Sequence, residues 1–154
     1  MQEVKEAYLS LKKRYKLPDY DKLNFEFEIS AIENIDFLLR EIKTKIIEKF
    51  ECYRKILEGI LQPDTNSLSS IHECKSFDDN EKKDIIRVYQ QIMCLYREAD
   101  EVLLKGDEKE LAKFITKAYE NWCKLKPKLI EFINKLKLSW KQESTTEEYL
   151  GYLG

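Results

Sequence analysis

Residues 30–63 read SAIENIDFLLREIKTKIIEKFECYRKILEGILQP, and this stretch decides the fold class. Its large apolar residues recur at steps of three and four, which places them on one face of an α-helix. They are Ile32, Ile35, Leu39, Ile42, Ile46, Phe50, Tyr53, Leu57 and Ile60. Ser30 and Glu33 have the spacing of a capping box, and Pro63 cannot continue a helix. We therefore expect a long helix over residues 31–62.

The same three- and four-residue spacing of apolar residues occurs in two later segments. It predicts a helix over residues 81–105, ended by Gly106, and a last helix that begins near Asp107 and extends to residue 141. Pro127 lies inside the last helix and is expected to kink it there or to divide it near Lys126. Between Pro63 and residue 80 we expect one short helix at about 67–74, because long structureless loops are uncommon in compact domains.

The segment before residue 30 is less regular. Residues 3–16 show helical spacing, and Pro18 ends that helix. Phe25, Phe27 and Ile29 alternate with acidic residues, as they would in a strand. No partner strand is evident, so residues 19–29 are interpreted as an extended connector whose apolar side chains pack on the bundle, and the pattern also allows one helical turn at 19–24 before the extended part.

Together these elements predict an all-α fold, an up-down helical bundle of three long helices plus an N-terminal helix. Residues 1–141 are expected to form a single domain, followed by a C-terminal tail at 142–154. The chain has 154 residues, with 43% hydrophobic and 36% charged residues, which is enough apolar material for a core.

Several features of the sequence indicate in which cellular compartment the protein is found. Glu3, Val4 and Lys5 follow Met1 closely without an apolar signal segment, and no apolar run is long enough for a membrane span. We therefore expect a soluble, cytoplasmic protein without a membrane partner. The four cysteines, at positions 52, 74, 94 and 123, are widely spaced and are expected to be buried free thiols, with one disulfide involving Cys74 as an alternative.

Catalytic and cofactor motifs are missing from the sequence. His72 is the only histidine, so a di-iron bundle or a His-Glu-x-x-His zinc site cannot form. The four glycines form neither a P-loop nor a dinucleotide-binding fingerprint. We expect no catalytic, cofactor or metal residues, and we expect His72 to be a partly exposed structural residue. An enzyme with an unrecognised pocket stays open, although the sequence leans away from an enzyme.

The charge distribution offers a nucleic-acid hypothesis. Residues 111–141 carry eight lysines and two acidic residues, whereas residues 19–36 carry six acidic residues and one lysine. Five lysines fall roughly along one side of the last helix, where a nucleic acid could bind through its phosphates: Lys113, Lys117, Lys124, Lys128 and Lys135. The alternative is that this basic helix lies beside acidic segments of its own fold or is solvated.

The C-terminal tail carries large apolar residues that termini usually lack. They are Tyr149, Leu150, Tyr152 and Leu153, and we interpret them as a candidate interaction tail that docks on its own bundle, on a partner or on a second copy.

The sequences of residues 15–30 (YKLPDYDKLNFEFEIS) and of residues 150–154 (LGYLG) resemble those of small all-helical archaeal proteins of unassigned function. The resemblance implies an archaeal origin and a helical fold, and it transfers no site residue.

From these features we expect a non-enzymatic helical-bundle protein that mediates protein–protein interaction or self-association, with an unknown protein partner or a homo-oligomer. The absence of catalytic motifs, the wide apolar face of the 31–62 helix and the apolar tail support this expectation. An RNA- or DNA-associated protein is the alternative.

Overall fold

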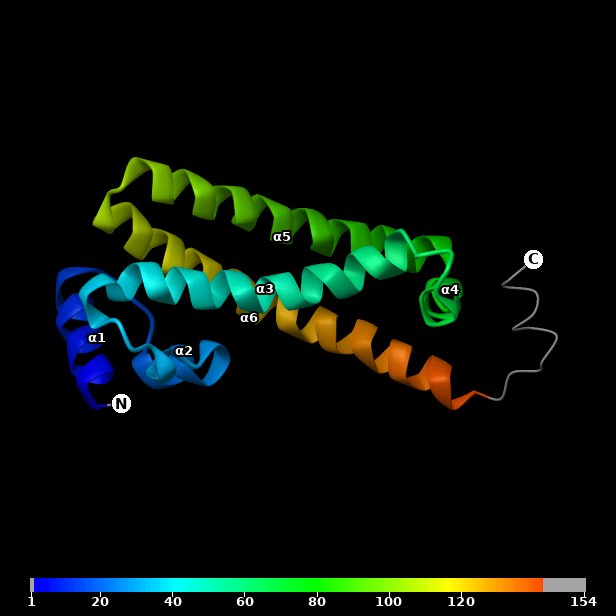
Figure 1. Cartoon of the computed structure of the whole chain (residues 1–154), viewed down its shortest axis with the longest axis horizontal. Helices are drawn as coiled ribbons and strands as arrows, with labels where there is room; N and C mark the ends of the chain where they lie inside the picture. The colour runs from blue at the N-terminus through cyan, green and yellow to red at the C-terminus, as the bar shows by residue number, and fades with distance from the viewer. Residues whose placement is uncertain (1, 143–154) are drawn as a thin grey trace. The chain divides into compact units, whose positions relative to one another are not determined.

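The computed structural model describes residues 2–142, and all regular secondary structure in that range is helical. In chain order the α-helices are α1 (Gln2–Arg14), α2 (Tyr20–Phe27), α3 (Leu38–Leu61), α4 (Leu68–Lys75), α5 (Asp79–Lys105) and α6 (Glu108–Lys141) (Figure 1). Two short 3₁₀ helices, η1 (Ile29–Ala31) and η2 (Ile35–Phe37), lie between α2 and α3. The expected all-α fold class, with three long helices and an N-terminal helix, is confirmed. Across the described range no helix is long and apolar enough to cross a membrane.

The chain divides into two compact units, each with its own core. Unit 1 consists of Met1–Glu51 and Met93–Lys124, and unit 2 consists of Cys52–Ile92 and Leu125–Gly154. The long helices α3, α5 and α6 contribute to both units, whereas α1 and α2 belong to unit 1 and α4 belongs to unit 2. The single domain expected over residues 1–141 stays a prediction.

Trp122 of α6 is at the centre of the unit 1 core. Its ring contacts Phe50 of α3 edge to face at a centroid distance of 5.4 Å and Phe27 of α2 at 5.9 Å. In α1, the buried ring of Tyr8 packs edge-on against Tyr20 at the start of α2, with the centroids 5.5 Å apart. Aromatic pairs in this arrangement contribute about 0.5–1.5 kcal/mol beyond the area they bury. These contacts hold the short N-terminal helices in the unit 1 core.

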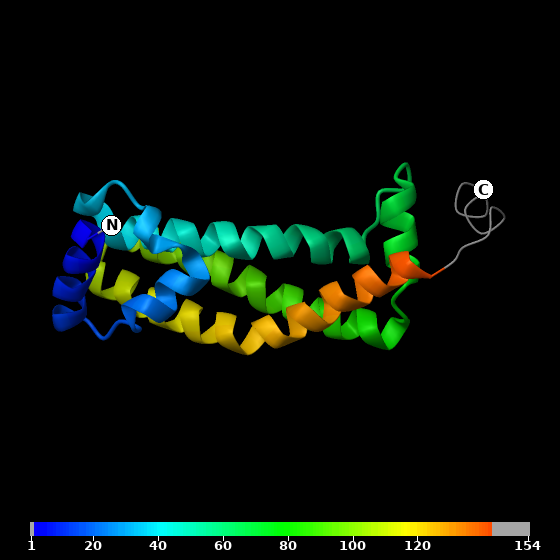
Figure 2. The same ribbon diagram turned by 90° about the horizontal axis from the view of Figure 1, so that it is seen from below.

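The core of unit 2 is built around α4 and the last turns of α6. Phe77, just after α4, packs edge-on against Phe132 of α6 at a centroid distance of 6.4 Å. His72 of α4 stacks on the Trp140 ring at 4.1 Å, and its Nε2 lies 3.2 Å from the carbonyl oxygen of Ser139. Figure 2 shows α4 beside the end of α6. Unit 2 therefore fixes the end of α6 to a helix that lies far from it in the sequence.

The extended connector expected over residues 19–29 is wrong, because most of this segment forms α2, and the helical turn allowed at 19–24 is part of that longer helix. Asp19 caps the helix by accepting a hydrogen bond of 3.1 Å from the backbone N–H of Lys22. Burial follows the helical period, with Tyr20, Leu23 and Phe27 inside, whereas Phe25 is 77% exposed. A period of two and a period of 3.6 both fit this short stretch, and the cap and the core decide between them.

The long helix also begins later than expected, at Leu38 instead of near Ser30. Ser30 lies within η1, and its backbone N–H donates a 2.7 Å hydrogen bond to the side-chain oxygen of Asn24. Asn34 then accepts a bond from the backbone N–H of Asp36 at the start of η2. Two polar side chains thus bond to the backbone at η1 and at the start of η2, residues 32–34 between these two turns are not helical, and the Ser30 capping box does not start a long helix.

The other helix boundaries agree closely with the sequence patterns. The short helix expected at about 67–74 is α4, and Gly106 ends α5 with a φ of +66°. Asp107 then accepts the backbone N–H of Lys109 at the start of α6. Helix α6 is continuous through Pro127, so the helix is not divided near Lys126. The kink expected at Pro127 stays a prediction.

The expectation that the cysteines are buried is wrong, although all four are free. Cys52, Cys94 and Cys123 are exposed, and Cys74 is partly exposed. A cysteine at the edge of a helical apolar face has the same sequence spacing whether the neighbouring helix covers it or not. The alternative of a disulfide involving Cys74 is not realised either.

Candidate functional site

The candidate site is a cleft of about 510 Å³ in unit 1. Helix α1 forms one wall, η2 and the first turn of α3 form the second, and the turn between α5 and α6 forms the third. The residues that line it are Ala7, Ser10, Leu11, Ile35, Asp36, Phe37, Leu38, Leu39, Arg40, Val102, Leu103, Gly106, Asp107, Glu108 and Leu111. Its volume lies within the range of about 300–1,000 Å³ that is typical of ligand pockets.

Apolar side chains give the cleft both its floor and its edge. Leu38 and Leu39 are buried, whereas Phe37 is 54% exposed and Leu103 is 48% exposed. Phe37 is the last residue of η2, directly before the buried Leu38 and Leu39 of α3. The cleft therefore leaves an aromatic ring and an aliphatic chain in water, where each could still be buried by a partner.

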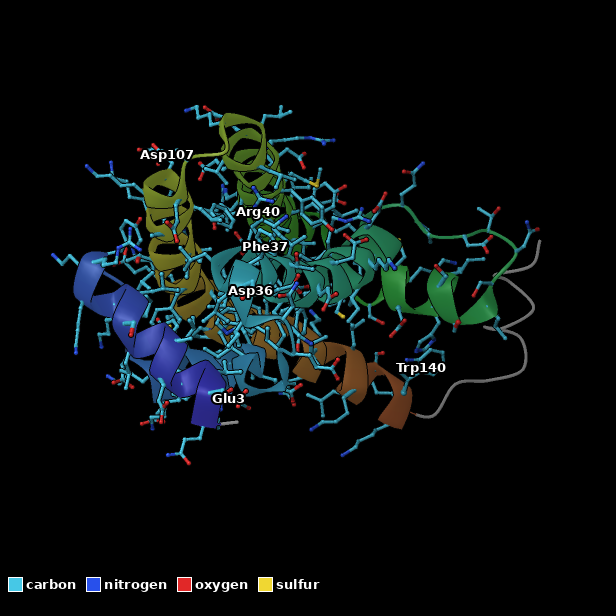
Figure 3. All side chains as sticks on the ribbon, turned by 60° about the vertical axis from the view of Figure 1, so that its left-hand side comes forward. Glu3, Asp36, Phe37, Arg40, Asp107 and Trp140 are labelled. Carbon is cyan, nitrogen blue, oxygen red and sulfur yellow. The ribbon has the colours of Figure 1, made fainter. Side chains whose placement is uncertain are left out.

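Charged groups surround these apolar residues, and carboxylates outnumber cations. Asp36, Asp107 and Glu108 line the cleft together with one cation, Arg40, whose guanidinium lies 5.5 Å from the centroid of the Phe37 ring. Figure 3 shows Asp36, Phe37 and Arg40 together at the start of α3, and Asp107 on the α5–α6 turn. The cleft is thus an apolar site with a negative edge.

Two of the carboxylates already have structural partners. Asp107 accepts a 3.0 Å bond from the backbone N–H of Lys109, and Glu108 accepts a 3.0 Å bond from the hydroxyl of Tyr15. Desolvation and the bond to Glu108 raise the pKa of Tyr15 above its ordinary value, so the phenol stays protonated and continues to donate near neutral pH. These bonds fix the positions of both carboxylates.

The five lysines proposed for nucleic-acid binding lie on α6, and four of them have acidic partners. In unit 1, Lys113 pairs with Glu110 at 3.2 Å and Lys117 pairs with Glu98 of α5 at 2.7 Å. Lys124, also in unit 1, is exposed.

In unit 2, Lys128 lies 3.4 Å from Glu131 and 3.9 Å from Asp84, and Lys135 pairs with Glu81 of α5. This arrangement favours the alternative in which the basic helix lies beside acidic residues of its own fold. Nucleic-acid binding stays a prediction.

His72 is buried and not partly exposed, which corrects the sequence expectation. Its Nε2–H donates to the Ser139 carbonyl and its ring stacks on Trp140. Within residues 2–142, no group of three or more histidine, cysteine or acidic side chains is arranged to hold a metal ion. The candidate interaction tail, Tyr149, Leu150, Tyr152 and Leu153, lies outside the described residues.

Sequence reasoning did not find the cleft, because its walls come from three distant segments. Ile35 and Leu103 have the spacing of helical apolar faces in the sequence, which does not distinguish a buried residue from one at the edge of a cleft. One weak sign of the cleft is present in the sequence. In the run Ile35-Asp36-Phe37, Phe37 follows Ile35 by two positions and therefore does not fit the three- and four-residue spacing of the helical apolar face.

Comparison of the chain with protein-family models, with curated proteins and with solved structures gave no match.

Proposed function

We propose that this protein is a non-enzymatic binding protein, and that its unit 1 cleft holds an apolar segment of a partner protein that also carries lysine or arginine. The observation behind this proposal is the pair of half-exposed apolar residues, Phe37 and Leu103, at the edge of a cleft of about 510 Å³. Full burial of a phenylalanine or leucine side chain contributes about 1.5–3 kcal/mol. The cleft therefore offers binding free energy that the isolated chain does not use.

The excess of carboxylates supports a basic occupant. Three carboxylates, those of Asp36, Asp107 and Glu108, line the cleft with one guanidinium, that of Arg40, which lies over the Phe37 ring. A segment with lysine or arginine beside its apolar residues would complement this edge, and charge complementarity supplies specificity and a faster association rate.

The polar groups of the cleft support binding more than catalysis. The lining residues include no histidine and no cysteine, and Asp107 and Glu108 are both occupied by hydrogen bonds that hold the local structure. General acid–base or nucleophilic chemistry needs an activated group that points at a substrate.

Nuclear magnetic resonance on the full chain tests this proposal. The probe is a synthetic amphipathic peptide of leucine and lysine, and the comparison probe has glutamate in place of lysine. We expect the basic peptide to shift the resonances of Phe37, Leu103 and their neighbours, and the acidic peptide to have little effect. Phe37→Ala should weaken binding, whereas Phe25→Ala removes a ring that is 77% exposed outside the cleft and serves as the control. Shifts confined to other parts of the chain, or equal weakening by both variants, would refute the proposal.

A further inference from the structure

Unit 2 has a groove of its own, with a volume of about 300 Å³, which is separate from the proposed function of unit 1. Helices α3, α4 and α6 form its sides. The residues that line it are Lys55, Ile56, Gly59, Ile60, Ser69, Ser70, Glu73, Ile133 and Leu136.

The groove has an apolar floor and an apolar edge. Ile60 and Leu136 are buried, whereas Ile56 is 37% exposed and Ile133 is 36% exposed. At Gly59 an added Cβ atom would meet no heavy atom within 4 Å, so the groove is open above this residue. The missing side chain at Gly59 leaves room for an incoming apolar group.

The end of α6 lies next to this groove. The indole N–H of Trp140 donates a 3.2 Å hydrogen bond to the carboxylate of Glu73, which lines the groove, and α6 ends one residue later at Lys141. Along the helix axis Leu136 is only about 8 Å from that end, at 1.5 Å for each residue. The chain that follows α6 therefore begins within a short distance of the groove.

The segment that follows has the length and the chemistry to fill the groove. Tyr149 comes seven residues after Gln142, and seven residues reach up to ~23 Å when extended. Residues 149–153 read YLGYL, with four large apolar side chains. Glu147 and Glu148 precede them and are complementary in charge to Lys55 on the groove wall.

We propose that residues 149–153 dock into the unit 2 groove of the same chain, with the Tyr149 and Tyr152 rings against Ile56 and Ile133. Docking covers the two exposed isoleucines and occupies the space above Gly59.

The test uses the full chain with carbon-13 at the isoleucine methyl groups. We expect ring-current upfield shifts of the Ile56 and Ile133 methyl signals, and nuclear Overhauser effects from these methyl groups to tyrosine rings. The double variant Tyr149→Ala/Tyr152→Ala should lose both signals. Gly59→Leu should lose the Overhauser effects, because the new side chain fills the groove, whereas Gly59→Ala should keep them. Circular dichroism checks that each variant is folded.

A wild-type chain without these Overhauser effects, or a Gly59→Leu variant that keeps them, would overturn the proposal. A mixed sample distinguishes the other occupants. In it the labelled chain is the double tyrosine variant and the unlabelled chain is wild type. If the upfield shifts return in the labelled chain, a second copy supplies the segment and same-chain docking is refuted. If they stay absent, and the wild-type shifts are unchanged on dilution, same-chain docking is supported.

Discussion

The indole N–H of Trp122 donates a 2.6 Å hydrogen bond to the carboxylate of Glu26, which lies 96 positions earlier in the chain. The Trp122 side chain is otherwise buried between Phe27 and Phe50, so this bond gives its one polar atom a partner inside the unit 1 core. Helix α2 supplies both Glu26 and Phe27, so Trp122 of α6 contacts α2 through a hydrogen bond and through a ring contact.

Trp122→Phe should destabilise the protein by about 2 kcal/mol, because it removes the hydrogen bond and leaves a small cavity. The measurement is the free energy of unfolding from urea denaturation. Trp140→Phe is the matched control, since it also removes an indole bond to a glutamate, but at an exposed position. Its cost should stay below about 1 kcal/mol. An equal loss of unfolding free energy in the two variants would contradict the conclusion that Trp122 is at the centre of the unit 1 core.

The helical form of residues 20–27 can be tested with two phenylalanines. Phe27→Ala should cost about 3–5 kcal/mol, because it empties a buried position in the core. Phe25→Ala should change the free energy of unfolding by no more than about 0.5 kcal/mol, because this ring is 77% exposed. An extended segment would place both rings on the same face, so similar large costs for the two substitutions would argue against α2.

This comparison also shows how far the sequence could predict the fold. Long periodic stretches identified α3, α5 and α6, and Gly106 and Asp107 marked the turn between α5 and α6. The sequence failed between residues 19 and 37, where each element is shorter than the window needed to tell a period of two from a period of 3.6. There Asp19, Asn24 and Asn34 determine the backbone through side-chain bonds, and the neighbouring core determines which face is buried.

The site was harder to predict than the fold. The unit 1 cleft exists because η2 ends where the α5–α6 turn and α1 approach it, and no local pattern encodes that approach. The exposure of the cysteines has the same origin, since a small residue at the edge of a helical face is covered or left open by its neighbours. The sequence shows the lysines of α6, but it does not show that three of them, Lys117, Lys128 and Lys135, lie close to Glu98, Asp84 and Glu81 of α5.

Two tyrosines with raised pKa values, the buried Tyr8 and the partly exposed Tyr119, predict a loss of stability at alkaline pH. Burial, reinforced by the nearby charge of Asp19, raises the pKa of Tyr8, and burial together with a hydrogen bond to Cys123 raises the pKa of Tyr119 to about 12. Since an unfolded tyrosine ionises near pH 10, the contribution of these groups is fully present below that pH and is lost as the pH rises above it. The free energy of unfolding should fall between about pH 10 and 12, by about 1.4 kcal/mol per pH unit for Tyr8.

Tyr8→Phe isolates that contribution. The variant loses the hydrogen bond to the Pro18 carbonyl and should be less stable than wild type at pH 7 by about 1 kcal/mol. Its stability should then fall less steeply above pH 10, because one ionisable group is gone. Parallel pH curves for the variant and the wild type would contradict the raised pKa of Tyr8.

The nucleic-acid hypothesis makes a separate prediction about salt. If α6 binds phosphates, affinity for double-stranded DNA or RNA must fall steeply with salt concentration, and changing Lys113, Lys117, Lys124 and Lys128 to Glu must abolish it. Because three of these lysines already pair with acidic residues, we expect a gel-shift assay near physiological salt to show no complex. A salt-sensitive complex that disappears in the lysine variant would establish the alternative function instead.

The most direct test of the binding cleft compares two neighbouring leucines by isothermal titration with the leucine–lysine peptide. Leu103 lines the cleft, whereas Leu104 is 89% exposed and lies outside it. The substitutions Leu103→Arg and Leu104→Arg change the net charge equally. We expect Leu103→Arg to weaken binding about tenfold or more, equivalent to about 1.4 kcal/mol, and Leu104→Arg to weaken it much less. Equal affinities of the two variants would contradict the assignment of the unit 1 cleft as the binding site.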